Sequence, residues 1–241
     1  SEAVLASENL KFNQHFDDVE AYNASLHPFI RNAVGSMEFG GTILNKRLNR
    51  NNDGGTIRRT GDAFQLATAV LFQNPVQMFG LTPNNLQDAP AEAMDFMRAV
   101  PTTWEDTKFI DGYPGKYIIL ARRNKGLWYV AAINNTGADL KTEVDLAFFG
   151  SNSAKLYTDG KELAFSTKEL KFKKNKKVKL TIPHNGGCVI VEGKEWSGNP
   201  ILPGFHADPE VLYSEKTGRY YIYTTTDGQP GWGGWYYTCF S

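Results

Sequence analysis

One stretch of the sequence gathers side chains that bind polar groups. It contains His27, Arg31 and Glu38 and ends in the glycine pair Gly40 and Gly41. A carboxylate beside a glycine pair, after an amphipathic helical pattern, is typical of a strand end at the functional rim of an α/β barrel, where catalytic loops leave the strands. We therefore take Glu38, His27 and Arg31 as candidate substrate-binding residues. The alternative is an ordinary strand and turn.

The elements around this stretch alternate between helix and strand. Five are predicted: a helix over 17–32 that ends or kinks near Leu26, a strand over 34–39, a helix over 63–73 capped by Thr60 or Asp62, a strand over 77–79 and a helix over 88–101. Residues 45–59 are polar and form a predicted loop. This order is typical of the closing units of an α/β barrel.

From residue 104 the pattern changes to short runs of alternating apolar and polar residues. Two such runs flank Asn124, Lys125 and Gly126 and predict a hairpin. Further short strands up to residue 195 predict an antiparallel β-sandwich. Nine lysines between 155 and 179 predict a solvated face or a charged sheet edge. Cys188 lies in an apolar strand, which predicts a buried and inert thiol.

Residues 199–209, rich in proline and glycine, begin a separate segment. Two strands are predicted after it, over 210–213 and 219–224, on either side of a turn. Asp208 directly precedes Pro209, a position where an aspartate commonly forms a turn.

Composition excludes several classes of protein. The 241 residues carry 26 basic and 26 acidic side chains, so no global field would attract nucleic acid or an anionic membrane. No apolar run is long enough to span a bilayer, and two cysteines imply neither a disulfide framework nor a cysteine metal site. The chain begins with Ser1 and stops within an aromatic run, so we expect a fragment whose compartment the sequence itself does not reveal.

Three runs resemble glycoside hydrolase family 97, which contains α-glucosidases and α-galactosidases. They are Pro-Phe-Ile-Arg-Asn-Ala-Val-Gly-Ser-Met-Glu (28–38), Phe-Gln-Leu-Ala-Thr-Ala-Val-Leu-Phe-Gln-Asn-Pro-Val-Gln (64–77) and Trp-Glu-Asp-Thr (104–107). The resemblance implies that 1–103 are the C-terminal part of a (β/α)8 catalytic barrel and that 104–195 are its C-terminal β-sandwich, of an oligomerisation type. Phe39, Gly40 and Gly41 depart from the Tyr-Thr-Pro of many relatives, which also have Asp in place of Glu38.

The same resemblance implies a Ca²⁺ ion held by oxygen ligands. Alignment outward from His27 places Glu2 at the family's general acid, which also contacts that ion. We therefore expect Glu2 as a catalytic residue and a metal ligand. The upstream half of its motif, the second catalytic carboxylate and the other calcium ligands would precede this chain.

The run Asn-Pro-Ile-Leu-Pro-Gly-Phe-His-Ala-Asp-Pro (199–209) resembles the opening of family 43 glycoside hydrolases. Those are five-bladed β-propellers that include β-xylosidases and α-L-arabinofuranosidases. The resemblance implies that Asp208 is the general base that activates water. Residues 196–241 are long enough for only the first blade.

The fold class expected is therefore multidomain α/β plus all-β: the tail of a (β/α)8 barrel, an antiparallel β-sandwich and one partial propeller blade. Glycoside hydrolysis needs two carboxyl groups that flank the bond. Because neither pair is complete here, we expect a hydrolase fragment that is inactive by itself. The resemblance implies an oligo- or polysaccharide substrate, possible homo-oligomers through the sandwich and a periplasmic or secreted parent. The alternative is a non-catalytic carbohydrate-binding or oligomerisation module, with Trp128 as the residue that would contact sugar.

Overall fold

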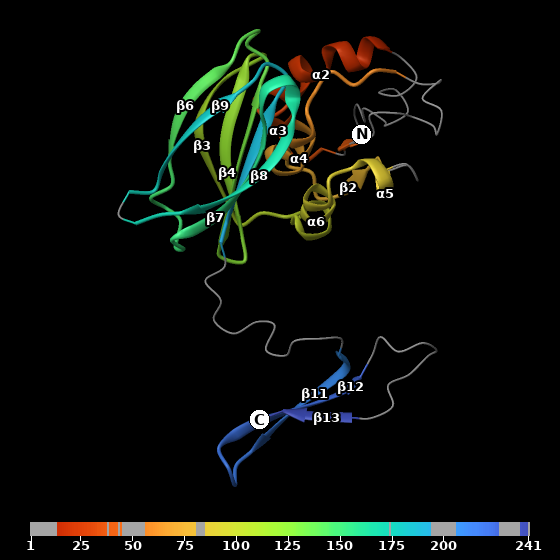
Figure 1. The fold of residues 1–241 in the computed structure, drawn as a ribbon, viewed down its shortest axis with the longest axis vertical. Helices are drawn as coiled ribbons and strands as arrows, with labels where there is room; N and C mark the ends of the chain where they lie inside the picture. The colour runs from red at the N-terminus through yellow and green to blue at the C-terminus, as the bar shows by residue number, and fades with distance from the viewer. Residues whose placement is uncertain are drawn as a thin grey trace. The chain divides into compact units, whose positions relative to one another are not determined.

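The computed structural model describes residues 14–37, 39–42, 44, 56–80, 85–173, 175–193, 206–226 and 237–240. The chain divides into two compact units, Ser1–Glu195 and Trp196–Ser241. Each unit is described by itself (Figure 1).

The first unit has helices in its N-terminal half and strands in its C-terminal half. The helices are α2 (Gln14–Leu26), α3 (Arg31–Val34), α4 (Asp62–Leu71), α5 (Asn85–Asp88) and α6 (Ala91–Ala99). Two short parallel strands lie among them, β1 (Phe39–Thr42) and β2 (Gln77–Phe79). The later strands are β3 (Asp106–Tyr113), β4 (Tyr117–Asn124), β5 (Leu127–Asn134), β6 (Leu140–Asp145), β7 (Ser153–Asp159), β8 (Phe165–Lys171), β9 (Lys177–Ile182) and β10 (Gly187–Glu192).

The later strands form two antiparallel sheets. Six of them make one sheet in the order β3-β4-β5-β10-β7-β8, and β6 pairs with β9 in a second sheet. The β4–β5 hairpin turns at Lys125 and Gly126, both with positive φ (47° and 79°), as a two-residue hairpin turn that matches strand twist requires. The predicted antiparallel β organisation of 104–195 is confirmed.

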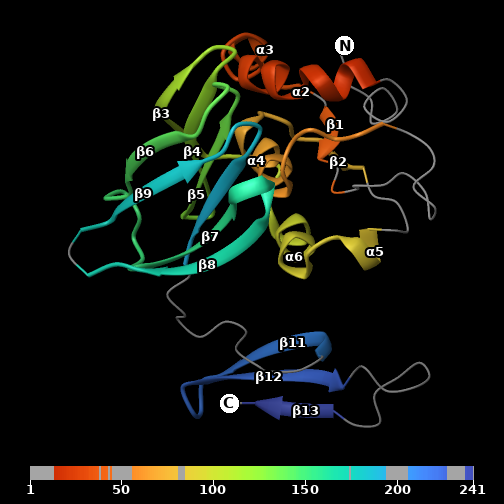
Figure 2. The ribbon, with the colours of Figure 1, turned by 45° about the horizontal axis from the view of Figure 1, so that its top comes forward.

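The six-stranded sheet is covered on both faces. In β4, Ile118 and Leu120 face the helices, while Ile119 and Ala121 face the β6–β9 pair. The same alternation runs through β5 and β10, because successive side chains of a strand point to opposite faces. Figure 2 shows the helices on one side of the sheet and β6 and β9 on the other. The unit therefore has a helical layer and two β layers, with one apolar cluster on each side of the large sheet.

Helix α4 is the centre of the helical layer. All ten of its residues are buried, and it contacts β4, β5, β7 and β10 on one side and β1 and α6 on the other. Seven of its ten residues are apolar, and the polar ones, Asp62, Gln65 and Thr68, are buried with partners within the unit.

Most of the predicted helices are present, but the helix predicted over 88–101 is α6, which begins only at Ala91. Helix α2 ends at Leu26, two residues before Pro28, and α4 and β2 lie where the sequence predicted a helix and a strand. The predicted strand over 34–39 is wrong, since α3 extends to Val34 and β1 begins only at Phe39. The carboxylate beside a glycine pair suggested a strand end there, but the turn that follows α2 leads into the further helical turn of α3.

The second unit contains one antiparallel sheet. Its strands are β11 (His206–Ser214), β12 (Arg219–Thr226) and β13 (Tyr237–Phe240), in that order. The turn between β11 and β12 ends at Gly218, whose φ of 66° suits a glycine. The two predicted strands are present and longer than expected.

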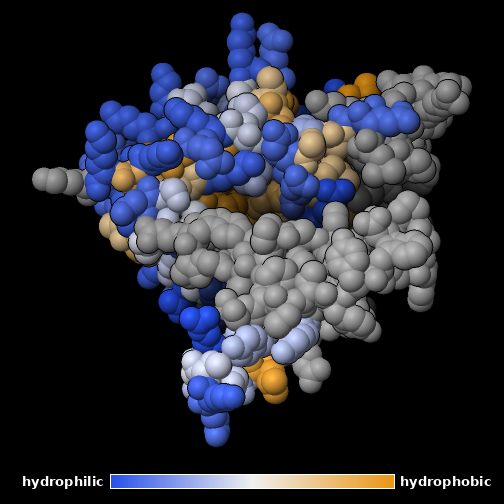
Figure 3. All heavy atoms as spheres, turned by 60° about the horizontal axis from the view of Figure 1, so that its bottom comes forward, coloured by the Kyte–Doolittle hydropathy of each residue, from blue (hydrophilic) through white to orange (hydrophobic). Residues whose placement is uncertain are grey.

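Most of the surface seen in Figure 3 over the first unit is hydrophilic, with apolar side chains exposed between charged ones. Strand β8 is an edge strand, and its Lys168 and Lys171 are exposed, as the lysine-rich pattern predicted. Among the described residues no helix is long and apolar enough to cross a membrane.

Candidate functional site

Several polar contacts of the first unit gather at the segment 56–62, which leads into α4. Ile57 exchanges two hydrogen bonds with the Gln14 side chain: its N–H donates to Oε1 at 2.8 Å, and its carbonyl accepts from Nε2 at 2.9 Å. Arg59 Nε donates to Asp18 Oδ1 at 2.8 Å. These contacts hold the segment along α2 and direct the chain into α4.

Glu20, a buried residue of α2, contacts the segment 56–62 at Thr60. Its carboxylate accepts hydrogen bonds from Gln65 Nε2 (2.6 Å) and Thr60 Oγ1 (2.9 Å). Burial raises the pKa of Glu20, and the two hydrogen bonds act in the opposite direction. Beside it, Arg58 and Asp62 form a buried ion pair. A carboxylate bonded in this way is a structural anchor between α2 and α4.

Asp159, at the end of β7, caps α4 from the sheet. Its Oδ1 accepts the N–H of Ala63, and its Oδ2 accepts those of Phe64 and Gly187, each at 2.9 Å. The first turn of a helix has N–H groups without intrahelical partners, and its positive dipole end favours a carboxylate. Burial nevertheless raises the pKa of Asp159 to about 6, and the three N–H groups oppose that shift.

This cap corrects the prediction for the start of α4. The N-cap is Gly61, and neither Thr60 nor Asp62 is the capping side chain. A Cβ at Gly61 would clash with the Asp159 carboxylate, so the glycine makes room for the cap. The sequence pattern predicts a capping side chain next to the helix. The residue that accepts the Ala63 N–H is Asp159, 96 positions away in sequence.

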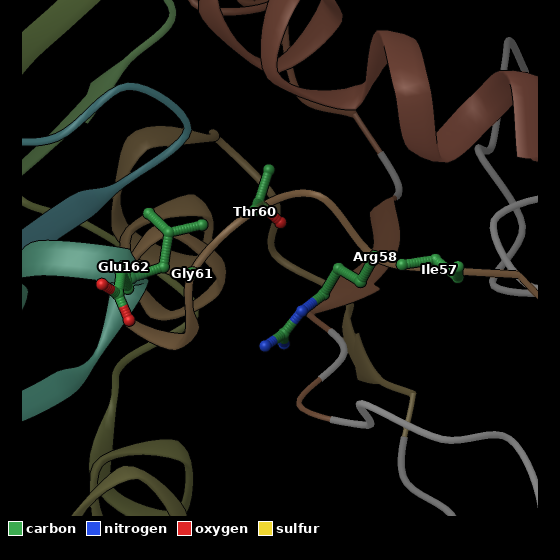
Figure 4. A pocket seen from close by; sticks show the side chains of 6 residues that line it. Ile57, Arg58, Thr60, Gly61 and Glu162 are labelled. Carbon is green, nitrogen blue, oxygen red and sulfur yellow. The ribbon is translucent and has the colours of Figure 1, made fainter. Parts of the chain in front are cut away.

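A cavity of about 240 Å³ lies next to this cap (Figure 4). Ile57, Arg58 and Thr60 line one side, and Glu162, from the short helix η1 (Lys161–Leu163), lies opposite. Arg58 already pairs with Asp62, and Glu162 is the one carboxylate among the described lining residues. Glycoside hydrolysis needs two carboxyl groups, of which the described part of this lining supplies one.

His27 lies in the turn after α2, against two aromatic rings. Its ring centroid is 5.5 Å from that of Phe72 and 6.4 Å from that of Phe39, both in edge arrangements. Neither ring nitrogen has a hydrogen-bond partner among the described residues. Burial, followed by the charge of Arg31, lowers the pKa of His27 and favours the neutral ring. Arg31 begins α3, close enough to His27 to exert that effect, so the structure brings these two candidates together. Their role toward a substrate stays a prediction.

The other predicted site residues are not placed as side chains. Glu2 and Glu38 lie outside the described residues. Asp208 is in β11 of the second unit, where the backbone is described and the side chain is not. Within the described ranges no group of three or more His, Cys, Asp or Glu side chains could hold a metal ion. The described residues therefore do not provide the donor set of a calcium site.

Trp128, the residue proposed for sugar contact in the alternative prediction, is 5% exposed. It packs in the cluster between the two sheets, with its ring 5.0 Å from that of Phe148 and with Lys108 and Arg123 over it. A covered indole has no face free for stacking on a sugar. Cys188 is fully buried, and burial raises the pKa of its thiol to about 12, as expected of an inert cysteine.

Comparison with known proteins identifies the β-sandwich. Residues 103–191 match the family model described as glycosyl-hydrolase 97 C-terminal, oligomerisation. This match supports the family 97 resemblance for the sandwich.

Two relatives named as alpha-galactosidases match a longer part of the chain. A retaining alpha-galactosidase of Bacteroides thetaiotaomicron is 31% identical over 204 residues, which are 78% of this chain and 30% of that protein. A probable retaining alpha-galactosidase of Streptomyces bingchenggensis is 31% identical over 119 residues, 49% of this chain and 17% of that protein. The chain thus spans less than a third of the length of these relatives.

Solved structures extend the similarity to the helical layer. A beta-arabinopyranosidase is 61% identical, with a TM-score of 0.74 over 79% of this chain and 30% of that one. An R171K variant of a family 97 enzyme from Pseudoalteromonas sp. strain K8 is 26% identical, with a TM-score of 0.63 over 75% of this chain and 30% of that one.

Proposed function

We propose that this chain is the C-terminal part of a family 97 glycoside hydrolase, in which residues 1–103 close a (β/α)8 catalytic barrel and the sandwich follows it. The observation that carries the proposal is the 61% identity to the beta-arabinopyranosidase over 79% of this chain, which includes more than the sandwich. The parallel pair β1–β2, with α4 between its strands in sequence, fits two neighbouring units of such a barrel.

We propose that the parent cleaves β-L-arabinopyranosides or α-D-galactosides with retention of configuration. The proteins named for these activities are 61% and 31% identical to this chain, and the latter are called retaining. The two sugars share the configuration of the ring hydroxyls and differ in the hydroxymethyl group of galactose. A retaining mechanism needs two carboxyl groups about 5–5.5 Å apart, of which Glu2 would be the acid.

The test is hydrolysis of paired aryl glycosides by the longer parent protein. We expect faster release from the β-L-arabinopyranoside than from the α-D-galactoside, and little from the α-D-glucoside. Glu2→Gln in that protein is expected to lower kcat about 10²–10⁴-fold. The isolated chain of 241 residues is expected to release no aglycone. Appreciable turnover by the isolated chain, or a parent specific for α-glucosides, would contradict the proposal.

We also propose that the parent protein binds a Ca²⁺ ion. Glu2 would be one of its oxygen ligands, and the others would come from upstream strands. When bound, the ion would order the acid and polarise the site. Chelation should therefore lower the activity and the Tm of the parent. The Tm of the isolated chain should not respond, because its described residues hold no cluster of ligands.

For residues 196–241 we propose the first blade of a family 43 propeller, with Asp208 as the general base. The antiparallel order β11-β12-β13 supports this, because a propeller blade is an antiparallel sheet of about four strands. A protein with the downstream sequence should hydrolyse an aryl β-xyloside or α-L-arabinofuranoside, and Asp208→Asn should abolish that activity. Unchanged activity of the variant would refute the role of Asp208.

A second function, self-association, is favoured by the oligomerisation description of the domain that 103–191 match. Of the two edge strands of the large sheet, β8 carries exposed lysines, whereas β3 exposes Phe109 (60%) and Tyr113 (59%). Charged edges resist strand pairing, and apolar edges favour it. We therefore expect a second copy of this chain to pair along β3.

Light scattering of the chain over a range of concentrations tests this. We expect the mass to rise with concentration, and the double variant Phe109→Ser/Tyr113→Ser to shift the chain to the monomer. Lys168→Arg/Lys171→Arg, on the opposite edge, keeps the charge of that edge; it is the control and should not change the mass. A mass that stays monomeric at all concentrations, or that the β3 variant leaves unchanged, would rule out this interface.

A further inference from the structure

The lysine-rich stretch 155–179 is a local concentration of positive charge in a neutral chain. It contains nine lysines and three acidic residues, Asp159, Glu162 and Glu169. Asp159 is buried as the cap on α4, so only two carboxylates of this stretch are exposed beside the lysines. Because the whole chain is neutral, the remaining residues carry an equal acidic excess, and the positive charge is concentrated on the sandwich.

Many of these lysines gather where β8 ends and β9 begins. Strand β8 ends at Lys171, Lys173 follows it, and β9 begins at Lys177. The connection between the two strands is held against the sandwich, since the Phe172 N–H donates to the Asn152 carbonyl at 2.8 Å. The charges are therefore presented from one end of the sandwich by an ordered backbone.

The ammonium groups at this end can be reached from solvent. Four of the lysines are exposed and form no ion pair with any described residue: Lys168, Lys171, Lys173 and Lys179. Lys177 pairs with Glu143 at 3.3 Å, but the two side chains are 45% and 41% exposed. An exposed pair of this kind contributes little free energy, so a stronger anion can displace it.

Protection of a sheet edge accounts for only part of this charge. Lysines on β8 discourage the pairing of an edge strand. On β9, however, Lys177 and Lys179 alternate with the buried Val178, so both point from the outer face of the strand into solvent. Residues two apart on a strand are separated by about 7 Å, and like charges at this distance repel each other. A bound anion would relieve that repulsion.

The surroundings of the lysines restrict the kind of anion. Of the large apolar side chains that are exposed in the described ranges, none lies between residues 114 and 211. The surface therefore offers no aromatic ring on which a nucleic acid base could stack, and no apolar side chain that could enter a membrane. A lysine ammonium is a hydrated point charge, which suits a solvated polymer with anions along its length.

We propose that this surface, formed by Lys168, Lys171, Lys173, Lys177 and Lys179, binds an acidic polysaccharide. Each ionic contact is weak, but several contacts to one polymer chain reinforce one another, because each further contact is intramolecular. The choice of a polysaccharide among polyanions rests on the proposed glycosidase function, whereas the positive surface itself does not. The site lies in the sandwich and goes beyond that function.

The test is the binding of the full chain to a fluorescein-labelled oligomer of polygalacturonate, measured by fluorescence anisotropy. A neutral galactan oligomer of the same length and with the same label is the uncharged control. We expect saturable binding of the acidic oligomer and none of the neutral one. The affinity should fall about tenfold between about 20 mM and about 200 mM sodium chloride, because the Debye length shortens from about 20 Å to about 7 Å.

A triple variant assigns the binding to this surface. Lys171→Gln/Lys173→Gln/Lys177→Gln removes three of its charges and should weaken binding about tenfold. All three side chains are exposed, so the variant should keep the fold, which circular dichroism checks.

The matched control removes the same net charge elsewhere. Lys116→Gln/Lys141→Gln/Lys216→Gln changes three exposed lysines, in the turn between β3 and β4, at the start of β6 and in the second unit. This variant should bind the acidic oligomer nearly as the natural sequence does.

Three outcomes would overturn the proposal: no binding of the acidic oligomer at low salt, equal binding of the neutral oligomer, or an equal effect of the two triple variants. Tighter binding of a DNA duplex of equal charge, or of phosphatidylglycerol vesicles, would overturn the assignment to a polysaccharide. Because hydrolysis is not measured, all of these outcomes leave the glycosidase proposal unaffected, and an inactive parent protein would leave the measured binding unchanged.

Discussion

The two faces of the six-stranded sheet share the same strands but are held by different polar contacts. On the β6–β9 face, Asn134 donates to the carbonyls of Ala138 and Ile182, and Glu192 accepts from the N–H groups of Trp128 and Ser151. All of these partners lie within the sandwich. On the helix face, Asp159 and Arg122 bond to the backbone of α4, far away in sequence.

This difference shows how the two parts of the first unit are joined. On the β6–β9 face, Asn134 and Glu192 bond to groups of the sandwich itself. On the helix face, the Asp159 carboxylate and the Arg122 guanidinium bond to α4. Helix α4 meets both: its N-terminal N–H groups bind the carboxylate, and a carbonyl near its C-terminus binds the guanidinium. The charges match the two ends of the helix dipole. We infer that these two contacts fix the position of α4 on the sheet, beyond what apolar packing alone specifies.

The largest effect is expected from removing the cap on the helix face. Asp159→Ala leaves the N–H groups of Ala63, Phe64 and Gly187 buried without acceptors, and we expect a loss of about 4 kcal/mol in the free energy of unfolding. Denaturant unfolding measures it. Asp139→Ala, at an exposed position, is the control and should change stability by less than about 0.5 kcal/mol. A loss below about 1 kcal/mol for Asp159→Ala would show that the cap does not anchor α4.

The second prediction concerns the opposite face. Ile190 is fully buried between the two sheets, and Ile190→Ala should cost about 3 kcal/mol through lost burial and a residual cavity. Because no charged group is removed, the cost should be the same at pH 5 and pH 7. A cost that changed with pH by more than about 1 kcal/mol would mean that the two faces are not independent.

The third prediction uses the pH dependence of the free energy of unfolding to distinguish the helix face from the β6–β9 face. The pKa of Asp159 is about 6 in the folded protein against a usual value of 3.8, so the folded state binds the proton more tightly than the unfolded state does. The contribution of this group to stability is therefore fully present below about pH 4 and declines as pH rises to about 6, by up to roughly 3 kcal/mol. Glu20 contributes with the same sign, since burial raises its pKa too.

The measurement is the free energy of unfolding between pH 4 and pH 7, compared with Asp159→Asn, which does not titrate. The difference between the two proteins should change with pH in this window. A constant difference would indicate that the three N–H donors offset burial and hold the pKa near its usual value.

The smallest effect is expected for an exposed polar contact at the same junction. Arg59 and Asp18 form an ion pair in which both side chains are 48% exposed. Arg59→Ala should shift the midpoint of denaturant unfolding only slightly, and the shift should vanish in 1 M salt, where charges are screened within about 3 Å. A shift as large as that of Ile190→Ala would place this pair among the structural anchors.

Local patterns predicted most of the regular elements. The apolar runs of β4 and β5, the alternation in β9 and the glycine turn at Gly126 required no distant partner, and the end of α2 followed from Pro28. The strand predicted over 34–39 was wrong because six residues around a turn carry too little periodicity to separate a helical turn from a strand. Glu2, Glu38 and the side chain of Asp208 lie outside what the structure describes, so their proposed roles are tested by activity.

The sequence by itself determined most strands of the sandwich and the family that the sandwich resembles, because these depend on patterns among residues a few positions apart. The tertiary structure decided the roles of Asp159 and Arg122, because a cap and a buried charge are defined by groups that only folding brings within hydrogen-bond distance. A signal was present in both cases: an aspartate directly before Gly160 at the end of a strand, and an arginine at the end of the apolar run 118–121. The sequence pattern shows Asp159 and Arg122 as charged residues at the ends of strands. Only the folded structure shows the groups that they bond to.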